Sequence, residues 1–149
     1  MGNGEKNSIL VIDDEKFNLE VLYSILAPEY NIYMTKSGSS AINMANKYLP
    51  DMILLDIIMP EMNGFEVFAA LKSSDKTRSI PVIIITGLDS VEDEEKGFNQ
   101  GAADFIHKPF SSRIVLSRVR NQVQMINQNR ELDALKQDLE KLRNCKVQP

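Results

Sequence analysis

The chain has 149 residues, of which 43% are hydrophobic, and a formal net charge of −4 at pH 7. The length suits one domain with a single core, and the acidic balance argues against direct nucleic-acid binding, because phosphate contacts need a basic surface. The sequence has no export signal and no apolar run of the roughly 18 residues that a membrane span requires. With Cys145 as its single cysteine, we expect a cytoplasmic protein without disulfides.

Five short apolar segments are spaced along the chain. Runs such as MILL and VIII are continuous rather than alternating, which is typical of strands buried on both faces of a parallel sheet. We therefore expect strands at 8–12, 30–35, 51–56, 81–86 and 104–108.

Helical patterns fill the intervals between these strands. Apolar residues recur at helical spacing over 17–26 and 41–49, and Pro28 and Pro50 should end these two helices. The apolar positions of the first are Phe17, Val21, Leu22, Ile25 and Leu26, and those of the second are Ala41, Ile42, Ala45, Tyr48 and Leu49.

The third helix should begin at a capping box formed by Asn63 and Glu66, with Phe65, Phe68 and Ala69 facing the core. The fourth helical stretch, SVEDEEKGFNQGA, is acidic and offers only Val91, Phe98 and Ala102 to a core. A helix that buries so little is held weakly, so we expect it to be the most mobile element.

Alternating strands and helices predict a doubly wound (βα)5 fold of the α/β class. In such sheets the ligand site lies at the carboxyl edge of the strands. Five polar residues stand at the expected strand ends and should meet there: Asp13, Asp14, Asp56, Thr86 and Lys108.

Clustered carboxylates need a cation, and an all-oxygen site suits Mg²⁺. A carboxylate can also attack phosphorus to form an aspartyl phosphate. The paired Asp13 and Asp14 fit a metal clamp, whereas Asp56 stands alone and is assigned as the nucleophile. Thr86 and Lys108 would then bind and neutralise the phosphoryl oxygens.

Four motifs carry a resemblance to a known family: DD (13–14), LLDIIMPEMNGFE (54–66), IIITG (83–87) and ADFIHKPF (103–110). In this order and spacing they resemble the CheY-like receiver domain of two-component response regulators, over residues 8–126. The resemblance implies a flavodoxin-like sheet with strand order 2-1-3-4-5. It also implies that a histidine kinase or phosphotransfer protein phosphorylates Asp56.

The resemblance further implies that Asp14, Asp56 and the backbone carbonyl of Ile58 hold Mg²⁺ directly, with Asp13 acting through water. Thr86 and Lys108 would contact the phosphoryl group, and the Lys108–Pro109 peptide would be cis. Thr86 and an aromatic residue on the last strand act as a coupled switch in this family. That residue is Phe105 here, which can move inward but has no hydroxyl to hydrogen-bond.

Ile58 and Leu88 each lie two residues beyond a phosphoryl-binding position, Asp56 and Thr86 respectively. Both are apolar, and we expect them to shield an acyl phosphate from water. The lone His107 is interpreted as a packing or surface residue rather than a ligand or base.

The last helix should start at Ser111 or Ser112 and continue to residue 144, with Val115, Val119, Val123 and Ile126 packing on the domain. Its later apolar positions follow a coiled-coil spacing: Leu132, Leu135, Leu139 and Leu142. We divide the chain into residues 1–7, disordered or derived from cloning, a receiver domain at 8–126, and a helical coiled-coil extension at 127–149.

The extension is expected to make a homodimer, although a solvated, frayed helix is the alternative. Such extensions in this family commonly lead to an output domain, often a cyclic-diguanylate enzyme.

Three rival functions remain. A phosphohydrolase with an aspartyl-phosphate intermediate usually needs a second acid where Ile58 stands, a flavodoxin-like nucleotide binder needs glycines after the first strand, and a degenerate receiver would dimerise without phosphate.

Overall fold

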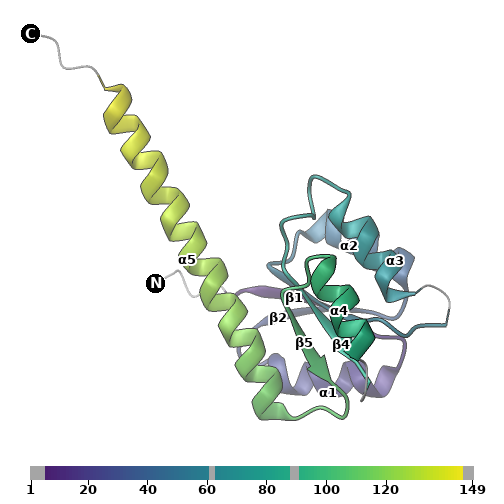
Figure 1. Cartoon of the computed structure of the whole chain (residues 1–149). Coiled ribbons are helices and arrows are strands. Elements are labelled where there is room, and N and C mark those ends of the chain that lie inside the picture. The colour runs from purple at the N-terminus through teal and green to yellow at the C-terminus, as the bar shows by residue number, and fades with distance from the viewer. Residues whose placement is uncertain (1–5, 61–62, 88–90, 146–149) are drawn as a thin grey trace, which may run out of the picture.

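Five parallel strands form one sheet in the computed structural model, which describes residues 6–60, 63–87 and 91–145. Their order is β2-β1-β3-β4-β5, so the predicted fold class and strand order are confirmed (Figure 1). The strands of the described chain are β1 Ser8–Ile12, β2 Asn31–Thr35, β3 Met52–Asp56, β4 Val82–Thr86 and β5 Asp104–His107.

Each strand is followed by a helix: α1 Lys16–Leu26, α2 Gly38–Tyr48, α3 Gly64–Lys72, α4 Val91–Asn99 and α5 Ser112–Asn144. The first two end two residues before Pro28 and Pro50, as the sequence predicts. Leu49 caps the end of α2 with a left-handed backbone conformation, at φ 48°.

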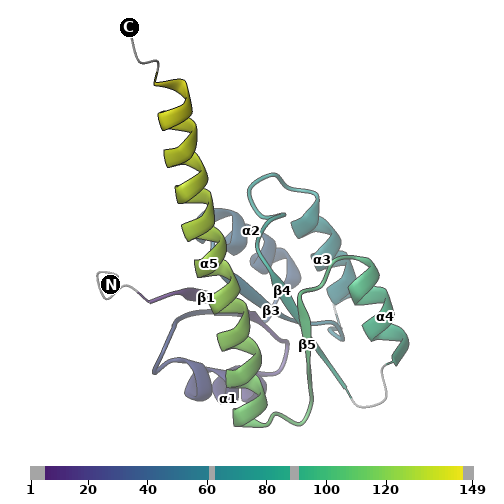
Figure 2. The ribbon, with the colours of Figure 1, turned by 60° about the vertical axis from the view of Figure 1, so that its left-hand side comes forward.

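Helices cover both faces of the sheet, with α1 and α5 on one side and α2, α3 and α4 on the other (Figure 2). Side chains alternate along a strand, so Ile9 and Val11 of β1 join the α1/α5 core while Leu10 and Ile12 join the other. All residues of β3 and β4 are buried, which explains their continuous apolar sequences.

The predicted inner faces of α1 and α3 need correction. Phe17 is exposed, whereas Leu19, which the predicted stripe omitted, is buried. In α3, Phe65 and Phe68 are buried as predicted, but Ala69 is exposed and Val67 packs in the core instead. Asn63 does cap α3, with its side-chain oxygen accepting a hydrogen bond from the Phe65 N–H at 2.8 Å.

Helix α4 rests on a glycine rather than on large apolar side chains. Val91 and Phe98 are 69% and 55% exposed, so the prediction that they enter the core is wrong, although Ala102 just after the helix is buried. Gly97 is the buried residue of α4. A Cβ there would lie 2.6 Å from Cζ of Phe105, so the missing side chain lets the helix approach β5.

Helix α5 continues far beyond the sheet (Figure 1). Its 33 residues span about 50 Å at 1.5 Å per residue, as predicted, and Ser111 caps its start. Val115 and Val119 are buried, and Val123 and Ile126 pack against the same core. The four leucines of the predicted seam are 50–72% exposed: Leu132, Leu135, Leu139 and Leu142.

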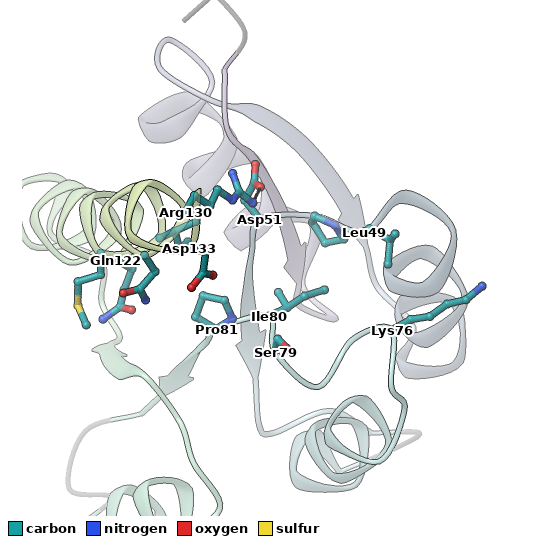
Figure 3. Close-up of a pocket in the computed structure, with 13 residues that line it drawn as sticks. Leu49, Asp51, Lys76, Ser79, Ile80, Pro81, Gln122, Arg130 and Asp133 are labelled. Atoms are coloured by element: carbon teal, nitrogen blue, oxygen red, sulfur yellow. Dashed lines mark hydrogen bonds and ion pairs between the residues drawn. The ribbon is translucent and has the colours of Figure 1, made fainter. Parts of the chain in front are cut away.

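The middle of α5 crosses the amino-terminal edge of the sheet, over a groove of about 540 Å³. Figure 3 shows this groove, with α5 on one side and the segments that lead into β3 and β4 on the other. Arg130 makes an ion pair with Asp51 across it. The contact between α5 and the sheet therefore reaches Arg130. This groove lies at the opposite edge from the strand ends that carry Asp56 and Thr86.

Candidate functional site

Three carboxylates meet at the carboxyl ends of β1 and β3. Asp13 and Asp14 follow β1 directly, and Asp56 is the last residue of β3. One oxygen from each of them lies within 4.8 Å of the others. β1 and β3 are neighbours in the sheet, and the strand order runs outward from them in opposite directions, to β2 on one side and to β4 and β5 on the other. A doubly wound sheet places its ligand site at such a switch in strand order.

Two of these carboxylates are buried, with Asp13 0% and Asp56 1% exposed. The Ile58 N–H donates to Oδ1 of Asp56 at 3.1 Å, and the Glu15 N–H donates to Oδ1 of Asp13 at 3.0 Å. Burial, together with the negative charge of Asp13, raises the pKa of Asp56 to about 6. The hydrogen bond from the Ile58 N–H and the charge of Lys108 lower the pKa but only partly offset this rise. Asp56 is therefore held as a carboxylate at some cost.

Lys108 supplies the cation at this site. Its Nζ lies 3.3 Å from Oδ2 of Asp56 and 3.6 Å from Oδ2 of Asp13. Burial opposes its charge, but Asp56 and Asp13 hold the pKa of Lys108 above its usual value. The Lys108–Pro109 peptide is cis, as the resemblance implies. One ammonium cannot balance three carboxylates, so the site retains an excess of negative charge.

The residues of this site fit a magnesium ion. Oδ2 of Asp13 is buried and, within the described chain, accepts no hydrogen bond. A buried carboxylate oxygen without a hydrogen bond is costly, and the Lys108 ammonium, 3.6 Å from it, is shared with Asp56, so a second cation would lower that cost. The donors of the cluster are all carboxylate oxygens, the ligands that Mg²⁺ prefers. The triad therefore fits the Mg²⁺ site that the resemblance to receiver domains implies.

Thr86, at the end of β4, has a buried side chain with two contacts. Its hydroxyl donates to the carbonyl oxygen of Gly87 at 2.8 Å and lies 3.1 Å from Nδ1 of His107. His107 in turn contacts Glu94 of α4, with Nε2 2.6 Å from Oε1. The prediction of a packing or surface role for His107 missed this contact with Thr86. The pairing of Thr86 with His107 in the register of β4 and β5 is the signal that could have revealed it.

Phe105 lies on β5 between the sheet and α4. It is buried, and its ring packs edge-on against Phe98 with the ring centroids 4.6 Å apart. Two residues, Ile58 and Leu88, were predicted to shield the site from water. Ile58, two residues after Asp56, is 67% exposed, and Leu88 lies outside the described residues.

Sequence comparison assigns the family. The model of the response regulator receiver domain matches residues 9–120, and the chain belongs to that family. A receiver domain is a signalling phosphoacceptor module, and the acidic cluster with Lys108 is consistent with its phosphoacceptor site.

Individual relatives agree with this assignment. The Vibrio cholerae protein named "Probable cyclic di-GMP phosphodiesterase" is 39% identical over 133 residues, which are 85% of this chain and 30% of that protein. "Response regulator PleD" of Caulobacter vibrioides is 43% identical over 114 residues, 76% of this chain and 25% of PleD. The chain therefore spans less than a third of the length of either relative.

The solved structure of the chemotaxis protein CheY4 of Vibrio cholerae matches with a TM-score of 0.74 at 26% identity, over 78% of this chain and 98% of CheY4. In the described part of the chain, none of the helices has the length and apolarity that crossing a bilayer requires.

Proposed function

We propose that Asp56 is the phosphoacceptor of this receiver domain and takes a phosphoryl group from a phosphohistidine of a histidine kinase or phosphotransfer protein. The observation that carries the proposal is the placement of a buried Asp56 carboxylate 3.3 Å from the Lys108 ammonium, within a cluster of three carboxylates. The fit of that cluster to Mg²⁺ supports a metal-dependent reaction.

In the proposed step a carboxylate oxygen of Asp56 attacks phosphorus, and an acyl phosphate bond forms. The phosphorus–nitrogen bond of the donor breaks, and its electron pair returns to the imidazole. Asp14, Asp56 and the carbonyl of Ile58 would hold Mg²⁺ directly, with Asp13 acting through water, and the bound ion would supply charge neutralisation.

The residues of this chain supply the remaining interactions. The Ile58 N–H fixes the orientation of Asp56, and the Lys108 ammonium pairs with a phosphoryl oxygen. The Thr86 hydroxyl turns to another phosphoryl oxygen, and Phe105 follows it inward. The surface formed by α4, β5 and α5 then changes its shape, which biases the protein between two states.

We propose that the exposed leucines of α5 make a parallel coiled-coil dimer with a second copy of the chain. Four leucines at 3-4-3 spacing on an exposed helix support this. Residues 127–149 then act as the extension that connects the receiver to an output domain. The name of the Vibrio cholerae relative favours an output of the cyclic-diguanylate type. A cytoplasmic location remains a prediction.

Mass spectrometry after incubation with acetyl phosphate and Mg²⁺ tests the proposal. The wild type should gain one phosphoryl group, and Asp56→Asn should gain none. The exposed Asp75 gives the control: its side chain pairs only with exposed Arg78 in the described structure, so Asp75→Asn should be phosphorylated normally. Failure of the wild type with acetyl phosphate and with phosphoramidate would favour a degenerate receiver. Catalytic release of phosphate from phosphomonoesters would favour the phosphohydrolase.

A further inference from the structure

Three side chains connect the end of β4 to helix α4. Oγ1 of Thr86 lies 3.1 Å from Nδ1 of His107, and Nε2 of the same ring lies 2.6 Å from Oε1 of Glu94. The strand register fixes the first contact, because Thr86 and His107 are direct partners across β4 and β5. The two ring nitrogens thus bridge a buried hydroxyl and a carboxylate on a different element.

The Thr86 hydroxyl has only one proton to donate. If it donates to the Gly87 carbonyl at 2.8 Å, the His107 ring must donate its Nδ1 proton to Oγ1. If it donates to Nδ1 instead, the neutral ring keeps its proton on Nε2 and gives it to Glu94. In either arrangement the imidazole holds the hydroxyl, and a phosphoryl oxygen must compete with it.

Helix α4 has few other attachments to the rest of the fold. In the described structure it buries Gly97 alone, while Phe98 contacts Phe105 and the Lys96 ammonium lies 4.4 Å from the centroid of the Phe65 ring. With so little apolar burial, a charge-assisted hydrogen bond between Glu94 and His107 is a substantial share of what fixes the helix.

We propose that His107 is a positioning residue that holds the Thr86 hydroxyl in the position it has before Asp56 is phosphorylated. Through Glu94, His107 also couples the release of this hydroxyl to helix α4. This inference rests on the proposed phosphorylation of Asp56. When the Thr86 hydroxyl turns to the phosphoryl group, the imidazole loses its partner on β4, and the bond that anchors α4 weakens. The path is distinct from the packing path through Phe105, because it consists of the polar contacts of His107 with Thr86 and Glu94, whereas Phe105 contacts Phe98 through their rings.

The inference predicts how substitutions change affinity for beryllofluoride, a phosphoryl mimic, in the presence of Mg²⁺. In the wild type, binding of the mimic must break the hydrogen bond between Thr86 and His107. His107→Ala removes this hydrogen bond, so the variant should bind the mimic about fivefold more tightly. Asn places a polar atom where Nδ1 lies, whereas Gln reaches toward the position of Nε2. His107→Asn should therefore restore the wild-type affinity, and His107→Gln should resemble His107→Ala.

Glu94→Gln tests the link to α4, with Glu95→Gln as the matched control, since Glu95 is the exposed neighbour on the same helix. Glu94→Gln should raise the affinity in the same direction as His107→Ala by a smaller factor, and Glu95→Gln should leave it unchanged. Equal affinities for the wild type, His107→Ala and His107→Gln would overturn the inference.

A spectroscopic measurement separates positioning from general stabilisation. His107 is the one histidine of the sequence, so its imidazole ¹⁵N signals cannot come from another residue, and their couplings to the ring protons distinguish Nδ1 from Nε2. The Nδ1 signal should shift when wild-type protein binds beryllofluoride, because the hydroxyl leaves it. An unchanged Nδ1 signal in protein that binds the mimic would overturn the inference and leave the proposed function intact. A wild type that binds no beryllofluoride and accepts no phosphate would overturn both.

Discussion

Replacing Asp56 with Asn removes one charge from the acidic cluster while keeping the shape of the side chain. The pKa of Asp56 is about 6 in the fold, against an ordinary value of 3.8. At about 1.4 kcal/mol per pKa unit, the difference amounts to about 3 kcal/mol. Without a bound cation, the ionised Asp56 thus lowers the free energy of unfolding by at most that amount.

The sign and the pH window follow from proton binding. Between pH 3.8 and about 6 the folded protein holds a proton on Asp56 that the unfolded chain has released, so stability falls as pH rises through this window. Above it both states are ionised and the loss is complete. Asp56→Asn should therefore be more stable than the wild type at pH 7.5, by up to about 3 kcal/mol, with little difference near pH 4.

Urea denaturation in the presence of a chelator, followed by circular dichroism at several pH values, measures the effect. Titration with Mg²⁺ should then stabilise the wild type, by about 1.4 kcal/mol at ten times the dissociation constant, and should stabilise the Asn variant far less. Asp75→Asn serves as the control with unchanged stability. A variant that is less stable than the wild type at pH 7.5 would show that Asp56 is not under electrostatic strain, and the argument for a cation would lose its basis.

Further predictions concern the loop after β3 and the long helix. Gly64→Ala should lower the free energy of unfolding by about 3 kcal/mol or prevent folding, because the new Cβ would lie 2.5 Å from the carbonyl oxygen of Asp56. Ile58→Asn should shorten the lifetime of the acyl phosphate, measured by phosphate release, and an unchanged or longer lifetime would contradict the shielding role. Arg130→Ala should speed hydrogen exchange of the α5 backbone from residue 127 onward, because the ion pair with Asp51 is lost. Leu135→Asn should abolish any dimer seen by sedimentation, and a variant that stays dimeric would place the interface elsewhere.

The sheet and the acidic cluster were predictable because local patterns determine them. The continuous runs of β3 and β4 indicate strands buried on both faces, and parallel strands place Asp56 and Thr86 at the same edge. Asp13, Asp14 and Lys108 follow from the same topological rule. None of these inferences requires knowing how far a helix is rotated about its axis.

The inner faces of the short helices could not be predicted in this way. Helix α3 has apolar residues at 65 and at 67–71, so spacing alone does not decide between Val67 and Ala69 for the core. In α4, the sequence indicates Val91 and Phe98 as the apolar anchors, but the helix approaches the sheet through Gly97. A close backbone approach depends on the missing Cβ, which a count of apolar residues does not detect.

These details of α4 bear directly on signalling. Glu94 and Phe98 are four residues apart on the helix and therefore share one face, and each contacts a residue of β5, His107 in one case and Phe105 in the other. A single rigid displacement of α4 would break both contacts together. Helix α4 buries little else in the described structure. These two contacts, together with the contact of Lys96 with the Phe65 ring, therefore provide most of the resistance to such a displacement. Thr86 contacts the first of these β5 residues, His107, directly, so in the proposed switch a local change at Thr86 reaches α4 through the polar contact, and loss of that contact leaves the aromatic one to hold the helix.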